Sequence, residues 1–115
     1  MVDSEVIILP RIVIHRLRVE AEKQGLSLEE YLLELITQGL DPKEKAREYI
    51  EVARELLEQS REELKKSDVR QAAERAWSAT ALAVKAYAYW KEGKRLNSRG
   101  ELWEYADKIA YELDE

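Results

Sequence analysis

The residues of this 115-residue chain best suited to chemistry are a lone lysine and a short polar turn. Lys85 is the only charged residue between Ala76 and Trp90, a stretch that is otherwise almost entirely apolar or aromatic. Burying an unpaired charge is costly, so a lysine in such surroundings needs a partner. Lys85 is therefore a candidate anchor for an anionic ligand or for a carboxylate such as Glu101. The alternative is that its stem lies along apolar surface while its ammonium group reaches water.

The polar turn Ser98-Arg99-Gly100-Glu101 is expected to begin a helix. Free backbone N–H groups at a helix N-terminus, together with an arginine, can hold a phosphate. The alternative is ordinary capping, in which Ser98 and Glu101 satisfy those donors themselves. Ligand or anion binding is thus predicted around Lys85, Ser98, Arg99, Glu101 and Trp103.

Three tryptophans, Trp77, Trp90 and Trp103, are candidates for stacking on a nucleic-acid base. Their helical spacing and alanine-rich surroundings favour places in the protein core instead. The net charge of −5 argues against bulk attraction to nucleic acid but leaves room for a local basic patch.

Several kinds of catalytic and metal chemistry are excluded by what the chain lacks. It contains no cysteine, which excludes disulfides, thiolate catalysis and zinc–thiolate sites. His15 is its single histidine, so no imidazole lies in the helical region around Lys85 to act as a general acid or base. We therefore expect no catalytic residue, no metal site and no cofactor.

The element that positions these residues is a helix expected from Asp68 to Lys91. Eight of its residues are alanine, the best helix former, and a helix that is apolar on nearly every side must be surrounded. Small side chains recur at steps of three and four and would let a neighbouring helix come close. They are Ala72, Ala76, Ala79, Ala83 and Ala86.

Two further helices are expected on either side of this one, at 42–66 and 99–113. The tight connection Lys66-Ser67-Asp68 predicts an antiparallel return. The outer face of helix 42–66 carries mixed charges, which we expect to be solvated and paired as Arg47/Glu51 and Arg54/Glu58. The sequence thus predicts an all-α, antiparallel up-and-down helical bundle over residues 41–115.

Residues 1–40 predict a separate arm of strand, helix and helix. The apolar run Val6, Ile7, Ile8, Leu9 favours a strand. Helices are expected at 11–24 and 28–38, the second capped by Ser27. This order resembles ribbon-helix-helix proteins, in which the strand pairs with that of a second chain and enters the DNA major groove.

The strand departs from that family because both of its faces are apolar, whereas polar or basic side chains read base edges. Residues 1–40 also hold seven acids against four bases. We therefore expect the arm to serve dimerisation, through Val6 to Leu9, and we expect no DNA binding.

A second resemblance covers about residues 46–110. Its motifs are Ala-x-x-Tyr at 46–49, Gln71-Ala72, Ala76-Trp77, the run 83–87 and Ser98-x-Gly-Glu-Leu-Trp103. This region resembles the archaeal PaREP family, first-numbered type. The resemblance implies a HEPN-type (higher eukaryotes and prokaryotes nucleotide-binding) helical domain, which often dimerises and whose active members cleave RNA with an Arg and a His on a late helix. No His follows His15, and the chain ends before that helix, so a shortened, non-catalytic member is expected.

Together these patterns predict a non-catalytic, dimeric, HEPN-like module that binds a nucleotide, RNA or a protein partner. The alternatives are an antitoxin-like ribbon-helix-helix regulator and a pure protein-interaction scaffold. A charged content of 37% with few labile residues suits a thermophile. No apolar run approaches the ~20 residues needed to span a bilayer, and no signal region is evident, so a cytoplasmic location without membrane attachment is expected.

Overall fold

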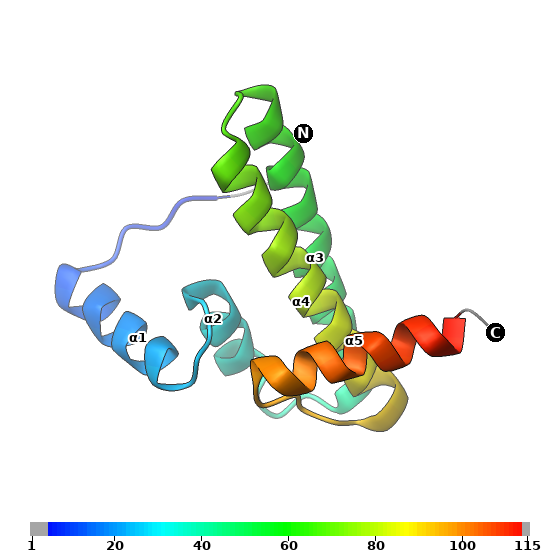
Figure 1. Ribbon diagram of the computed structural model, residues 1–115. Coiled ribbons are helices and arrows are strands. Elements are labelled where there is room, and N and C mark those ends of the chain that lie inside the picture. The colour runs from blue at the N-terminus through cyan, green and yellow to red at the C-terminus, as the bar shows by residue number, and fades with distance from the viewer. Residues whose placement is uncertain (1–4, 114–115) are drawn as a thin grey trace. The chain divides into compact units, whose positions relative to one another are not determined.

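The computed structural model describes residues 5–113, and all the regular structure in that range is helical (Figure 1). Its helices are α1 (Arg11–Lys23), α2 (Leu28–Ile36), α3 (Pro42–Lys65), α4 (Val69–Glu92) and α5 (Arg99–Leu113). The prediction of an all-α protein is confirmed. The chain divides into two compact units, residues 5–40 and 41–113, and each is described by itself.

The helices α3 and α4 form an antiparallel hairpin, coloured green to yellow in Figure 1. Asp41 caps α3, since its carboxylate accepts hydrogen bonds from the backbone N–H groups of Lys43 and Glu44 at 2.9 and 3.0 Å. Asp68 caps α4 in the same way, with Gln71 as donor at 3.1 Å. The turn between the helices is short, as predicted, and α4 ends at Gly93, which has the left-handed φ of 62° typical of such a position.

Small side chains let α3 and α4 pack along their length. Ala72, Ala79 and Ala86 of the predicted alanine series are buried. The hydroxyl of Ser60 donates a buried hydrogen bond of 2.7 Å to the backbone oxygen of Ala72, which links the two helices at one end. Toward the other end, the rings of Tyr49 and Tyr89 meet edge to face with centroids 5.3 Å apart. Close packing along the alanine series is therefore confirmed.

The last helix, α5, crosses α4 (Figure 1). Its contacts advance along both helices in the same direction, because Trp103 meets Trp77 and Glu112 meets Lys91. The up-and-down prediction is thus correct for α3 and α4 and wrong for α5. The connecting segment explains the difference, because Leu96 is buried in a core cluster with Ala81 and Ala88 of α4, so the chain turns back along α4 before α5 begins.

The unit formed by residues 5–40 consists of α1 and α2 after an extended segment. Gly25 ends the first helix with a φ of 68°, and the Ser27 hydroxyl caps the second by accepting from the N–H of Glu30 at 3.1 Å. The predicted strand Val6–Leu9 is wrong for the described chain, which contains no strand. A strand needs a hydrogen-bonding partner, and none is present beside these residues, of which Val6, Ile7 and Ile8 are almost fully exposed.

Within residues 5–113, none of the helices combines the length and the apolar character needed to cross a membrane.

Candidate functional site

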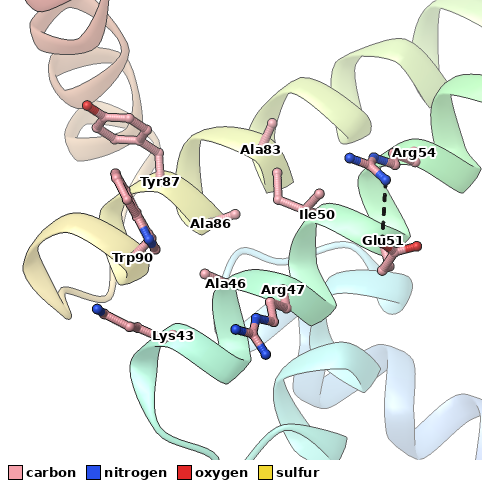
Figure 2. Close-up of a pocket in the computed structure, with 10 residues that line it drawn as sticks. All are labelled: Lys43, Ala46, Arg47, Ile50, Glu51, Arg54, Ala83, Ala86, Tyr87 and Trp90. Atoms are coloured by element: carbon pink, nitrogen blue, oxygen red, sulfur yellow. Dashed lines mark ion pairs between the residues drawn. The ribbon is translucent and has the colours of Figure 1, made fainter.

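A groove of about 650 Å³ lies between α3 and α4 (Figure 2). Its apolar surface comes from both helices, and its charged rim comes from α3 alone. The apolar and aromatic lining is Ala46, Ile50, Ala83, Ala86, Tyr87 and Trp90, and the charged lining is Lys43, Arg47, Glu51 and Arg54.

The helical repeat explains why these residues share one groove. On α3, residues three or four apart lie on one face, so Lys43, Arg47 and Ile50 point to the same side. On α4, the same spacing brings Ala83 and Trp90 to the facing side. Ala46 and Ala86 are only 5% and 1% exposed because the two helices pack closely there, and the longer side chains around them line the rest of the groove.

The rim of the groove is basic, although the chain as a whole is acidic. Arg54 pairs with Glu51, with 3.6 Å between the charged groups. Lys43 and Arg47 form no ion pair with any residue in the range 5–113. The groove thus carries three cations against one carboxylate, in a chain whose net charge is −5. A local excess of positive charge beside an apolar surface favours an anionic ligand.

One end of the groove is aromatic. The rings of Tyr87 and Trp90 have centroids 5.9 Å apart and an interplanar angle of 57°. The Trp90 side chain is 57% exposed and stands at the groove beside Lys43 (Figure 2). An exposed indole next to a cation can stack on a planar ligand that also carries negative charge.

A cluster of charged and phenolic groups joins the C-terminal ends of α4 and α5. The Nζ of Lys91 lies 2.6 Å from the Glu112 carboxylate, and the Nζ of Lys108 lies 3.3 Å from that of Glu92. The hydrogen bond from Lys91 lowers the pKa of Glu112, and the reciprocal bond raises the pKa of Lys91. Burial raises the pKa of Tyr105, with a further rise from the neighbouring Glu92 carboxylate.

The predicted anion site at the start of α5 shows ordinary capping. The Ser98 hydroxyl accepts a hydrogen bond from the N–H of Glu101 at 3.1 Å. The carboxylate of Glu101 lies 3.9 Å from the Nζ of Lys94, and Arg99 is exposed. Lys85 is half-buried on α4 and is not part of the groove lining. The expected anion-binding role of these residues stays a prediction.

The expectation that the three tryptophans lie in the core is wrong. Trp77, Trp90 and Trp103 are all exposed by more than a third of their surface. Trp77 and Trp103 pair with each other, with ring centroids 5.4 Å apart, so they form an aromatic surface where α4 meets α5.

Sequence reasoning missed Lys43 and Arg47 because they belong to what was expected to be a solvated charge ladder. The expected ion pairs are also wrong, since Arg54 pairs with Glu51 and Arg61 pairs with Glu58. One signal could have identified the groove. Lys43 and Arg47 lie at the edge of the apolar stripe of α3, the stripe that packs against the alanines of α4.

Comparison with known families decides where the chain belongs. The archaeal PaREP1/PaREP8 family is matched by residues 48–115. The chain is a member of this family. No curated protein and no solved structure matches it. The PaREP1/PaREP8 match includes Arg54, Tyr87 and Trp90 of the groove, whereas Lys43 and Arg47 precede it.

The described part of the chain offers no set of side chains suited to bind a metal ion. No group of three or more His, Cys, Asp or Glu side chains in residues 5–113 is placed to hold a metal ion. His15 is exposed on α1. The lining of the groove supplies ionic contacts from its cations and stacking contacts from its aromatic rings.

Proposed function

We propose that this PaREP1/PaREP8 protein is a non-catalytic binding module whose α3–α4 groove takes a nucleotide or a short single-stranded RNA segment. The observation that supports this function is that Lys43 and Arg47, which have no ion-pair partner among residues 5–113, line the same apolar groove as the exposed indole of Trp90. Phosphate oxygens would meet the two cations, and a base would stack on Trp90. Base–aromatic stacking contributes about 1–3 kcal/mol per base.

The dimensions of the groove suit such a ligand. Ligand pockets typically have volumes of about 300–1,000 Å³, and this groove falls within that range at about 650 Å³. Its cations extend from Lys43 to Arg54, eleven residues along α3, which at a rise of about 1.5 Å per residue is roughly 16 Å. That length leaves room for more than one phosphate, so a free nucleotide and an RNA end offer the same chemistry from two sources.

We further propose that the helices α3, α4 and α5 form a HEPN-type domain and that the protein works in the cytoplasm as a homodimer. The family membership and the all-helical fold of residues 41–113 support the first point. Self-association is supported by four aliphatic side chains that are at least 77% exposed to solvent, namely Val6, Ile7, Ile8 and Ile12. Apolar surface of this kind is typical of an interface.

Calorimetric titration of the full chain with ATP and, separately, with penta-adenylate tests the proposed ligand class. Arg47→Gln should lower the affinity for whichever probe binds more tightly by about tenfold, the loss typical of a hydrogen bond to a charged group. Arg61→Gln is the matched control, because Arg61 lies on the same helix outside the groove. If penta-adenylate binds no more tightly than ATP, the ligand class is free nucleotides. If penta-adenylate binds more tightly than ATP, the ligand class is RNA.

Tryptophan fluorescence places the ligand. Binding should quench the emission of the wild-type protein, and Trp90→Phe should remove most of that quenching. Trp103→Phe is the control, because Trp103 is equally exposed and lies on α5. If neither probe binds, the proposed function is wrong, and the exposed Trp77–Trp103 pair would then favour the interaction scaffold as the second candidate.

A further inference from the structure

Tyr87 belongs both to the groove and to the contact between α4 and α5. Its ring lines the groove beside Trp90. Its hydroxyl donates a hydrogen bond to the Glu112 carboxylate of α5 at 3.4 Å, and its ring centroid lies 6.3 Å from that of Tyr105. In Figure 2 the hydroxyl points away from the groove residues toward the neighbouring α5 ribbon. One side chain therefore connects a ligand surface with a helix that does not touch the ligand.

Lys91 strengthens the same connection. Its Nζ lies 2.6 Å from the Glu112 carboxylate and 5.7 Å from the centre of the Tyr87 ring. Glu112 thus accepts from both the phenol and the ammonium group, and the position of the ring is tied to the docking of the last turns of α5. The side chains of Lys91 and Glu112 are 41% and 31% exposed, so solvent screens this ion pair, and its part in the connection is to help hold the Glu112 carboxylate beside Tyr87.

We infer that occupancy of the groove and docking of the C-terminal half of α5 are coupled through Tyr87. This inference rests on the proposed nucleotide or RNA function. A base that packs against Trp90 and Tyr87 selects one orientation of the phenol ring, and that orientation is the one that Glu112 and Lys91 hold. Coupling between two events is reciprocal, so the ligand must favour docked α5 as much as docked α5 favours the ligand.

The coupling also gives α5 a role as the readout of the groove. The helix carries the exposed Trp103, which pairs with Trp77, and a ligand that fixes α5 would also fix this aromatic surface. Nucleotide or RNA binding would in this way change how readily the α4–α5 surface meets another molecule.

The test uses the full chain and whichever of ATP or penta-adenylate binds the more tightly. Hydrogen exchange of the amides in residues 105–113 should slow when the probe binds to the wild-type protein. Glu112→Gln, which substitutes no residue of the groove, should weaken binding of the probe at least about fivefold, at the lower end of allosteric coupling. Tyr87→Phe, which keeps the ring and removes the hydroxyl, should bind the probe more weakly by a similar factor, because coupling is reciprocal, and should show no slowing of exchange in α5.

Glu104→Gln is the matched control, because it removes an equal charge from an exposed position of α5. It should bind as tightly as the wild type and keep the change in exchange. Probe binding with unchanged exchange in α5 and wild-type affinity in Glu112→Gln would overturn the coupling and leave the proposed function intact. If neither probe binds to the wild-type protein, both the coupling and the proposed binding function are overturned.

Discussion

Ser67 stands in a backbone conformation that an L-amino acid adopts at a cost. Its φ is 64°, and it follows the last turn of α3. The N–H of Asp68 donates to the oxygen of Glu63 at 2.9 Å, and the N–H of Ser67 donates to that of Leu64 at 3.0 Å. These two bonds define a Schellman motif, in which the left-handed position is usually glycine.

Ser67→Gly should therefore raise the free energy of unfolding by up to about 1 kcal/mol, because the left-handed region is free of steric strain only for glycine. Urea denaturation of both proteins measures the difference. Ser78→Gly, in the middle of α4, should lower stability by about 0.5 kcal/mol and serves as the opposite control. A loss of stability in both variants would show that Ser67 is not strained.

At the scale of helices, the packing of α3 on α4 depends on the small size of particular alanines. Ala79 is 6% exposed and belongs to the series that faces α3. Ala79→Leu should destabilise the protein by about 1–3 kcal/mol, because a larger side chain must push the helices apart. Ala73→Leu adds the same atoms to an exposed position of α4 and should be nearly neutral. Equal urea midpoints for the two variants would contradict close packing.

The docking of α5 should depend on acidity. In the folded protein, the hydrogen bond from Lys91 of α4 to Glu112 of α5 lowers the pKa of Glu112 below the ordinary 4.5. The stability that this carboxylate adds is therefore fully present above about pH 4.5 and is lost as the pH falls through its lower folded pKa. Glu112→Gln should show a smaller loss of unfolding free energy below pH 4.5 than the wild type. Glu104→Gln should keep the wild-type profile, and coincident curves for all three proteins would rule out this contribution.

Helix ends were predictable because their signals are local. The caps at Ser27, Asp41 and Asp68 each join a side chain to a backbone N–H no more than three residues away. The strand Val6–Leu9 could not be predicted in the same way, because a strand depends on a partner that the sequence does not specify. The direction of α5 was predicted wrongly for a related reason. It depends on the burial of Leu96 against α4, which is a contact between segments and not a local signal.

At the scale of the molecule, the candidate site was harder to predict than the fold. The stripes of α3 and α4 are each visible in the sequence, but a groove exists only once their register is set. That register brings Arg47 into the same groove lining as Ala86 and Tyr87, and it turns part of the charge ladder into the rim of a candidate site. Lys85, by contrast, was singled out by its apolar neighbours in sequence, and these do not determine which side of the helix it occupies.

Self-association is the prediction that concerns the whole molecule. The aliphatic side chains of Ile8 and Ile12 are 91% and 77% exposed, and their burial in a second copy would remove apolar surface from water. Sedimentation should show a dimer for the wild type and a monomer for the Ile8→Lys/Ile12→Lys double variant, with helicity unchanged. Leu64→Lys, which changes an exposed leucine of α3, should remain dimeric. A wild-type protein that sediments as a single copy at working concentration would refute the homodimer, while nucleotide binding in the groove could still be measured on that monomer.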